Sequence, residues 1–353
     1  MRMVQCLIIG AGPYGLALAN YLHEQGTEFK ITGKPMELWR EHTFPSADLR
    51  SDMPTSEIVH PTGEYAISRF YGMRYPDKPV PRGRVAVSLY REYVDWVLAQ
   101  LPYPIRPDYV MDLQKEKAGF VATLANGDKV RAHHVVIATG IAHHLKIPRT
   151  FQGDPRVIHS YQVQFIATLR KKRVLVVGAG QSAAESIDLL LENENDVEWY
   201  SRKPPRFYTE PLDLPRWIFN LVIRSAGLLH RLPPKMIQRV FGIFSATTMT
   251  PDYQSRVEKI PRYSHLPETA GYDAIVTATG YRYDVKALNF LSPDLLSQIR
   301  VSQDIPVVDR QFRSSVPNLY FIGPITEPFF GPPMKFIVGA RYMAPRLARV
   351  LAS

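Results

Sequence analysis

The sequence predicts an α/β protein built from two βαβ units, one of them inserted into the other. Two apolar segments of strand length each run into a glycine-rich turn and then into a helix, at residues 4–23 and 174–191. Two further apolar strands end in Ala-Thr-Gly, at residues 135–140 and 274–280, and a hairpin turn is expected at Asn126-Gly127 before the first of them. A last short strand at residues 318–323 also closes on glycine, and a helix is expected from about Lys335 to Ala352. This order predicts one nucleotide-binding unit that is interrupted by another.

The first unit carries the pattern G-x-G-x-x-G directly between its strand and its helix. Gly10 permits the tight turn, Gly12 lets the backbone approach a pyrophosphate, and Gly15 allows the helix to pack closely on the strand. The helix N-terminus then presents free amides to the phosphate charge. Residues 29–32 supply the second strand, which gives the pattern its full βαβ context. The residues assigned to this cofactor are Gly10, Gly12, Pro13, Tyr14 and Gly15.

The second unit repeats the pattern with Ala183 as its third small residue, which the fingerprint permits. Two complete fingerprints indicate two cofactors that must meet. After the second strand of this unit the chain has Arg202 where an NAD-specific enzyme places an acid, and a guanidinium binds a 2′-phosphate bidentately. We therefore expect NADPH here, and a solvated charged turn is the alternative. The residues assigned to this cofactor are Gly178, Gly180, Gln181, Ser182, Ala183 and Arg202.

Composition excludes several classes of protein. The 353 residues include one cysteine, which excludes an intramolecular disulfide, a thiolate zinc site and a redox mechanism that needs a cysteine pair. No metal site is expected, and a cytoplasmic location is the default expectation. The chain has no run of 18 uncharged apolar residues, and its N-terminus leads directly into the first strand, so neither a membrane span nor a signal peptide is predicted.

The net charge of +10 first suggests a nucleic-acid partner. Most of the surplus lies in two segments without acidic residues, 214–250 and 328–353. Two polyanionic cofactors and an acidic substrate account for this charge without a nucleic acid. Three interpretations of residues 214–250 stay open: a lid over a substrate pocket, which we favour, an amphipathic helix pair on a membrane surface, or a dimer contact.

Together these motifs resemble the flavoproteins with two dinucleotide-binding domains, and within them the class B flavin monooxygenases. Residues 10–15, GAGPYG, are similar to that family's FAD site, and residues 178–185, GAGQSAAE, to the NADPH site of ornithine and lysine N-hydroxylases. Residues 273–281 resemble a D-x3-(L/F)-A-T-G-Y signature, with Thr277 at the Leu/Phe position. Residues 151–159 only approximate the F-x-G-x3-H linker of the family, because the histidine comes two residues late.

The resemblance implies an α/β fold with two Rossmann-like dinucleotide-binding domains, the NADPH domain inserted into the FAD domain. The FAD domain is expected at residues 1–155 and 283–353, and the NADPH domain at residues 156–282 with its basic apolar insertion at 214–250. The implied activity is that of a monooxygenase, in which NADPH reduces FAD and a C4a-(hydro)peroxyflavin transfers one oxygen atom of O2 to a small-molecule substrate. N-hydroxylation of an amine is the preferred reaction, and a homodimer is the usual assembly.

Few side chains are needed for this chemistry because the flavin carries it. His159 and Ser160, in the linker that enters the NADPH domain, are the candidate polar groups near the nicotinamide, although a structural histidine is about equally favoured. Arg50 is a candidate contact to flavin or substrate, with a solvated loop residue slightly preferred, and Trp39 is expected near the flavin ring. The strand ends assigned to the cofactors supply Thr279, Gly280, Tyr281 and Gly323.

One position departs from the dinucleotide-binding pattern. At the end of its second strand the FAD domain usually carries an acid for the adenosine ribose, but this chain has Gly33 there. The role passes either to Glu37 or to the backbone.

Two other functions remain open. One is an NADPH-dependent flavin reductase that passes electrons to an external acceptor such as a ferredoxin or a quinone. The other is a non-enzymatic flavin-binding sensor.

Overall fold

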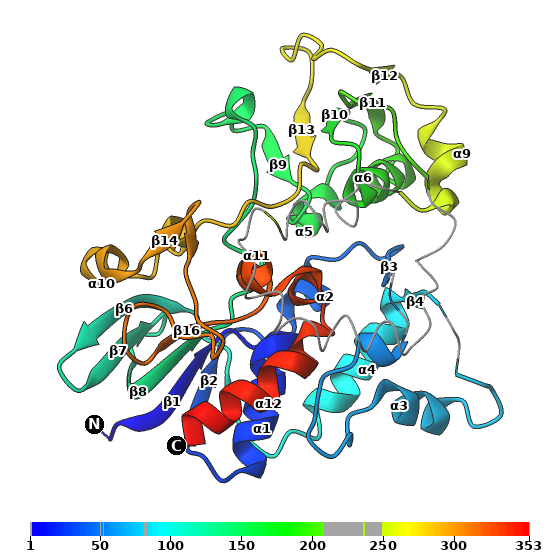
Figure 1. Ribbon diagram of the computed structural model, residues 1–353. Coiled ribbons are helices and arrows are strands. Elements are labelled where there is room, and N and C mark those ends of the chain that lie inside the picture. Colours follow the sequence, from blue (N-terminus) through cyan, green and yellow to red (C-terminus); the bar gives the residue numbers. More distant parts are fainter. Residues whose placement is uncertain are drawn as a thin grey trace.

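The computed structural model describes residues 2–49, 51, 53–80, 83–207, 236 and 249–352. Two lobes, each built on its own sheet, make up the molecule (Figure 1). Arg50 and nearly all of the segment 214–250 lie outside the described residues, so the predictions made for them stay predictions.

The first sheet contains seven strands, in the order β5-β2-β1-β8-β7-β6 with β16 paired to β8. The strands β1, β2, β8 and β16 run parallel, whereas β6, β7 and β8 form an antiparallel meander whose last turn is the predicted Asn126-Gly127 hairpin. Because β16 follows the second unit in the sequence, the chain does return to complete its first sheet, as the order of motifs predicted. The bounds are β1 Val4–Ile9, β2 Phe29–Thr32, β5 Ile105–Arg106, β6 Val110–Glu116, β7 Gly119–Leu124, β8 Lys129–Ile137 and β16 Leu319–Phe321.

Helices α1 (Pro13–Glu24) and α12 (Gly339–Ala352) lie side by side against this sheet (Figure 1). The expectation that the last helix begins near Lys335 was wrong, since residues Pro332–Lys335 form a separate 3₁₀ turn. The hydroxyl of Tyr14 explains the later start. It donates to the carbonyl oxygens of Met334 and Phe336, both at 2.9 Å, and so holds the backbone in a turn instead of a helix.

The second sheet is entirely parallel, in the order β12-β11-β10-β13-β9. Its central strands are near-continuous apolar runs that are buried on both faces, as is usual for parallel sheets, and helix α6 (Gln181–Glu192) packs on one of these faces. The bounds are β9 Val157–His159, β10 Arg173–Val177, β11 Asp196–Tyr200, β12 Arg262–Tyr263 and β13 Ala274–Thr277.

Shorter elements complete the described chain. The helices are α2 Glu37–Glu41, α3 Ile67–Arg74, α4 Val87–Leu98, α5 Val163–Ile166, α9 Gln254–Val257, α10 Pro293–Gln298 and α11 Glu327–Phe330. The strands are β3 Asp48–Leu49, β4 Val85–Ala86, β14 Val301–Ser302 and β15 Ile305–Pro306. Within the described ranges, no helix is both long and apolar enough to cross a lipid bilayer.

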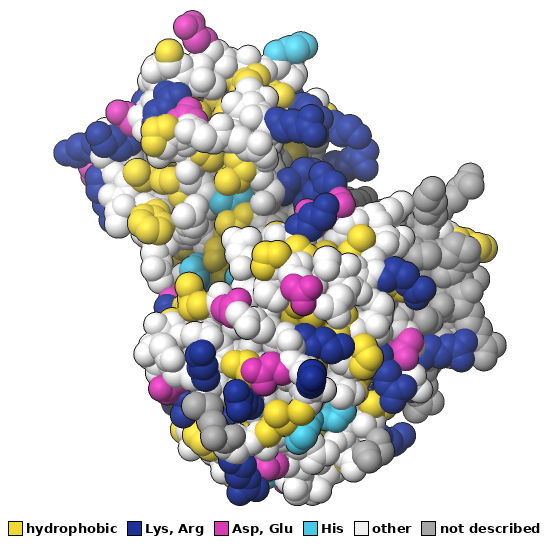
Figure 2. Space-filling view, turned by 90° about the vertical axis from the view of Figure 1, so that its left-hand side faces the viewer, with side chains coloured by type: hydrophobic (Ala, Val, Ile, Leu, Met, Phe, Trp, Pro, Cys, Tyr) yellow, Lys and Arg dark blue, Asp and Glu magenta, His cyan; other side chains and the backbone are white. Residues whose placement is uncertain are grey.

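The two lobes are joined by more than the chain crossings between them. Phe44 and Ala47, which follow α2 of the first lobe, belong to the apolar core of the second lobe. The hydroxyl of Tyr253 donates to the carbonyl oxygen of Ser46 at 2.9 Å. Figure 2 shows the narrowing of the molecular surface between the lobes. The segment 42–48 therefore fastens the second lobe to the first.

Candidate functional site

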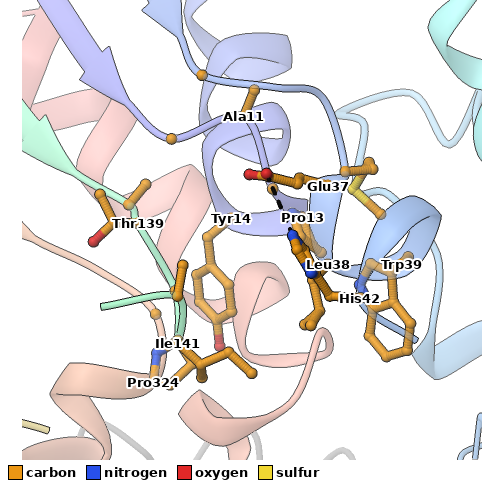
Figure 3. A pocket seen from close by; sticks show the side chains of 18 of the residues that line it. Ala11, Pro13, Tyr14, Glu37, Leu38, Trp39, His42, Thr139, Ile141 and Pro324 are labelled. Carbon is orange, nitrogen blue, oxygen red and sulfur yellow. Dashed lines mark hydrogen bonds and ion pairs between the residues drawn. The ribbon is translucent and has the colours of Figure 1, made fainter. Parts of the chain in front are cut away.

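A cavity of about 910 Å³ opens beside the carboxyl ends of β1, β2 and β8 (Figure 3). Four stretches of chain that are distant in sequence form most of its wall: residues 9–14, 32–39, 138–143 and 323–337. The crevice outside the carboxyl ends of parallel strands is where open α/β sheets bind their ligands. The position and size of the cavity therefore suit a dinucleotide cofactor.

The three glycines of the first turn meet three different requirements. Gly10 has φ +114°, and a Cβ there would lie 2.4 Å from the carbonyl oxygen of Ala138. A Cβ on Gly15 would lie 1.9 Å from the carbonyl oxygen of Gly10, so α1 packs against the turn only because this residue has no side chain. A Cβ on Gly12 would meet nothing within 4 Å, because Gly12 faces the cavity at the N-terminus of α1.

Most of the residues predicted to bind FAD surround this cavity. Tyr14 lines it with its ring, while its hydroxyl is used by the carbonyls before α12, and burial raises the pKa of this phenol well above its ordinary value. The Trp39 ring contacts the Tyr90 ring edge-on, with centroids 5.3 Å apart. The predicted residues that line the cavity are Gly10, Gly12, Pro13, Tyr14, Trp39 and Gly323.

At the end of β2 the cavity wall carries charge. Gly33, with φ +109°, is followed by Lys34, whose Nζ lies 3.7 Å from Oε1 of Glu37 and 3.0 Å from Oε2 of Glu41. Glu37, Glu41 and His42 lie close enough together to share a cation. Lys34 pairs with both carboxylates, so these residues form an ion-pair network at the cavity wall.

The second glycine turn repeats the packing of the first. Gly178 has φ +147°, and a Cβ there would lie 2.3 Å from the carbonyl oxygen of Ala278, as Gly10 does with Ala138. In each unit the first glycine thus packs on the alanine of the neighbouring Ala-Thr-Gly segment. Gln181, which was predicted to bind NADPH, has a side chain held within the protein, since its Oε1 accepts from the Thr250 amide at 2.8 Å. Ser182 and Ala183 follow in the first turn of α6, and Ala183 is fully buried.

Positive charge gathers at the carboxyl ends of β11 and β12. Arg202 is exposed just after β11, and Nη1 of Arg262 donates to the carbonyl oxygen of Ser201 at 3.2 Å. Neither guanidinium has a carboxylate within 4.0 Å among the residues described, and the same holds for Lys203 and Arg206. Arg262 carries no local sequence signal, because only the pairing of β12 with β11 brings it to Ser201, the residue before Arg202.

His159 and Ser160 lie inside the second lobe and not on the cavity wall that the described residues form. Nδ1 of His159 accepts from the Tyr161 amide at 3.1 Å, so Nε2 carries the proton and donates to the carbonyl oxygen of Gly280 at 3.1 Å. Burial lowers the pKa of this imidazole. The amide of Ser160 donates to the Thr277 carbonyl oxygen at 3.0 Å. Both residues therefore hold the linker against the end of β13.

The other two residues predicted at the end of β13 also contact this linker. The Thr279 hydroxyl donates to the carbonyl oxygen of Lys146, and the Tyr281 ring lies 5.5 Å from the His159 ring. Burial raises the pKa of Tyr281 to about 12. The predicted Thr279, Gly280 and Tyr281 thus fix the path of the chain between the lobes.

Several residues of the cavity wall carried no sequence signal. Tyr161 reaches the cavity from the second lobe, and its ring stacks on that of His42 with centroids 3.9 Å apart. Tyr109 and Phe290 also line the wall, from the loop before β6 and from the loop before α10. These residues lie in irregular segments that have no periodicity and no motif. Their position on the cavity wall is therefore evident only from the fold.

The environment of the single cysteine does not suit a redox role. Cys6 lies in β1, is completely buried, and has a pKa that burial raises above its ordinary value. Since the chain holds one cysteine, no dithiol can form within it.

The sequence pattern of the pyridine nucleotide-disulphide oxidoreductase family matches residues 7–323. The probable indole-3-pyruvate monooxygenase YUCCA9 of Arabidopsis thaliana is 26% identical over 207 residues, which make up 54% of this chain and 45% of that protein. The chain therefore spans less than half the length of this plant relative. A ferredoxin–NADP reductase of Salinispora arenicola (strain CNS-205) is 23% identical over 337 residues, which make up 93% of this chain and 87% of that reductase.

Among solved structures, the fold is similar to that of the reduced form of ornithine hydroxylase (PvdA) from Pseudomonas aeruginosa. The TM-score is 0.80 and the identity 17%, with 99% of each chain covered. At this identity the similarity establishes only the fold, with two Rossmann-like units in the same arrangement. The activity has to be inferred from the residues of the site.

Proposed function

The chain belongs to the pyridine nucleotide-disulphide oxidoreductase family, and on that basis we propose that it is an FAD- and NADPH-dependent monooxygenase. In this proposal it inserts one oxygen atom of O2 into a small-molecule substrate, and N-hydroxylation of an amine is the preferred reaction. One observation carries the proposal: Tyr161, from the lobe with the second glycine turn, lines the cavity beside the first glycine turn. This contact supports the proposal that the two cofactors meet at the cavity.

The residues of the cavity fit FAD. Gly12 leaves open space at the N-terminus of α1, a helix of 12 residues whose free amides and dipole favour a pyrophosphate. Trp39 and Ile141 supply apolar surface for the flavin portion (Figure 3). The stretch that contains Lys335 carries the chain past the same cavity just before α12, so its cation favours the anionic cofactor.

Bound FAD would supply the electron-transfer and oxygen chemistry, and the protein supplies binding, orientation and exclusion of water. Phe290 and Phe336 add apolar wall that keeps water from the cofactor. Burial lowers the pKa of His143, which also lines the cavity, so this imidazole is neutral at pH 7. A neutral ring both donates and accepts a hydrogen bond, which suits contact with an uncharged substrate amine.

NADPH is proposed at the second turn. Arg202 follows β11, and Arg262, at the start of β12, donates to the carbonyl oxygen of Ser201, the residue before Arg202. Neither guanidinium has a carboxylate partner in the described chain, and both would bind the 2′-phosphate. In this arrangement His159 is a positioning residue. Its hydrogen bonds to the Gly280 carbonyl and the Tyr161 amide fix the chain between the two proposed cofactor sites, so it would position both cofactors indirectly.

Disulfide reduction, the activity in the family's name, does not suit this chain. Such reductases pass electrons through a pair of cysteines, and here Cys6 stands alone and buried in β1. Electrons on the flavin must therefore pass to oxygen or to an external acceptor.

The second candidate function is electron transfer from NADPH to an external acceptor. The similarity to a ferredoxin–NADP reductase over 93% of the chain favours this function. The two functions differ in how they use oxygen. The test follows NADPH oxidation, O2 uptake and hydrogen peroxide release with a panel of primary amines. A monooxygenase shows a substrate for which O2 uptake rises and peroxide release falls. A reductase instead oxidises NADPH without O2 when ferredoxin or a quinone is added, and it responds to no amine.

A further inference from the structure

The FAD cavity lacks the acid that dinucleotide-binding folds place at the end of the second strand. That carboxylate hydrogen-bonds the ribose hydroxyls of the adenosine. Here β2 ends at Thr32 and the next residue is Gly33, which has no side chain and a φ of +109° that strains any L residue. An acceptor for the ribose must therefore come from another part of the wall.

Two carboxylates line the cavity within the described chain, those of Asp48 and Glu37. Asp48 lies in β3, 3.5 Å from Nη1 of Arg84, and belongs to the contact between the lobes. Glu37 lies four residues after Gly33 on the same wall. Its stretch is bound to the first glycine turn, because the Met36 amide donates to the carbonyl oxygen of Ala11 at 3.0 Å.

The backbone turns sharply to place Glu37 there. Met36 has φ +52°, a left-handed conformation that costs a residue other than glycine about 1 kcal/mol, and its side chain is buried. Figure 3 shows the result: the Glu37 side chain lies beside Ala11 and Pro13 and points away from Trp39. Strained backbone persists where its surroundings require it, and functional sites are where it concentrates.

Only one oxygen of the Glu37 carboxylate, Oε1, has hydrogen-bonding contacts with the described residues. Its Oε1 accepts from the Tyr109 hydroxyl and lies 3.4 Å from Nε2 of His42. Its Oε2 receives no hydrogen bond from the residues that the structure describes. Lys34 lies 3.7 Å from Oε1 and offsets the negative charge, so a second anionic group, the pyrophosphate, is tolerated nearby.

We propose that Glu37 replaces the acid missing at Gly33 and accepts hydrogen bonds from the 2′- and 3′-hydroxyls of the FAD adenosine. The inference rests on the proposed placement of FAD in this cavity. Glu41 provides a matched control, because it also pairs with Lys34 and lies on the same helix, one turn later, but does not line the cavity.

The experiment measures the binding of two flavins to apoprotein: FAD, and its analogue with 2′,3′-dideoxyadenosine. Wild-type protein should prefer FAD by about 10- to 100-fold, the value of hydrogen bonds to a charged group. Glu37→Ala should bind both flavins with equal affinity, Glu37→Gln should show an intermediate preference, and Glu41→Ala should keep the wild-type preference.

The inference is overturned if Glu37→Ala keeps the wild-type preference or if wild-type protein has none. Because the readout is a ratio of two affinities of one variant, a general loss of folding or of flavin affinity does not mimic the expected result. Wild-type protein that binds no FAD at all would instead contradict the proposed function. The two failures are therefore distinguishable.

Discussion

The His42 imidazole stacks on the Tyr161 ring at 3.9 Å between centroids, and its Nδ1 donates to the Tyr161 carbonyl oxygen at 2.9 Å. His42 follows α2 in the first lobe, whereas Tyr161 follows β9 in the second. This pair joins the lobes at the cavity wall, beside Phe44 and Ala47 in the core of the second lobe. The relative position of the two lobes, and of the cofactor sites proposed on them, thus depends on it.

Replacing His42 by alanine should loosen the joint between the lobes. The loss of one stacked ring and one hydrogen bond should lower the free energy of unfolding by about 1–2 kcal/mol. His42→Phe keeps the ring and should lose less. Thermal unfolding of the three proteins measures the effect, and equal losses in the two variants would show that stacking contributes nothing.

The first and second glycines of the FAD turn should respond differently to alanine. Gly10→Ala should destabilise the apoprotein, because the new Cβ would meet the Ala138 carbonyl oxygen at 2.4 Å. Gly12→Ala should leave the apoprotein as stable as wild type and weaken FAD binding, since its Cβ enters only the cavity. Thermal unfolding of apoprotein and flavin titration separate the two effects. Unweakened FAD binding in Gly12→Ala would argue against the placement of the pyrophosphate at this turn.

Arg202→Ala and Arg262→Ala should each lower kcat/KM for NADPH by about 10- to 100-fold and leave NADH unaffected, because each removes charge-assisted hydrogen bonds to the 2′-phosphate alone. Arg170→Ala is the control, since this exposed arginine also donates to backbone carbonyls but lies at the amino ends of β10 and β11, opposite to Arg202. Steady-state flavin reduction with both nucleotides is the measurement. An equal loss with NADH in the arginine variants would refute the assignment.

His144 should make the protein less stable in mild acid. Burial lowers its pKa to about 4, and its Nδ1 accepts from the Asp284 amide at 3.3 Å. An unfolded histidine takes up a proton near pH 6.5, but the folded one resists until about pH 4. Its contribution is therefore complete above pH 6.5 and falls by about 3 kcal/mol as the pH drops to 4.

Denaturant unfolding of wild type and His144→Asn across pH 4 to 6.5 checks this value. The variant should lose less stability over that range, because asparagine does not titrate. His133→Asn, at an exposed position of β8, should behave as wild type. If the free energy of unfolding falls equally with pH in wild type and in His144→Asn, the His144 ring is not buried in a neutral state.

The parts of the fold that could be predicted from the sequence are those with local patterns. Gly10 and Gly178 each stand in a local strand–turn–helix pattern, so the glycine pattern alone locates both turns, although their closest contacts are with Ala138 and Ala278 of distant segments. The strand that returns to the first sheet and ends before Gly323 is likewise located by its own short apolar pattern. The last helix was misplaced because the hydroxyl of Tyr14, more than 300 residues away in sequence, holds the turn before it.

The site was harder to predict where it depends on the assembled fold. Arg262 reaches Ser201 only through the pairing of β12 with β11, and Tyr161 reaches the cavity only because the lobes meet. The sequence offers His159 as a polar group near the nicotinamide, but both of its ring nitrogens form hydrogen bonds with the backbone. A sequence does not reveal whether a polar side chain is already satisfied within the protein.

Stopped-flow spectroscopy can show whether reduced flavin in this cavity reacts with oxygen to oxygenate a substrate. Protein reduced with NADPH under anaerobic conditions is mixed with oxygenated buffer, and the flavin spectrum is followed. A monooxygenase should form a long-lived oxygen adduct of the flavin that decays faster when an amine substrate is present. Immediate reoxidation without such a species, together with rapid reduction of ferredoxin or a quinone, would identify a reductase instead.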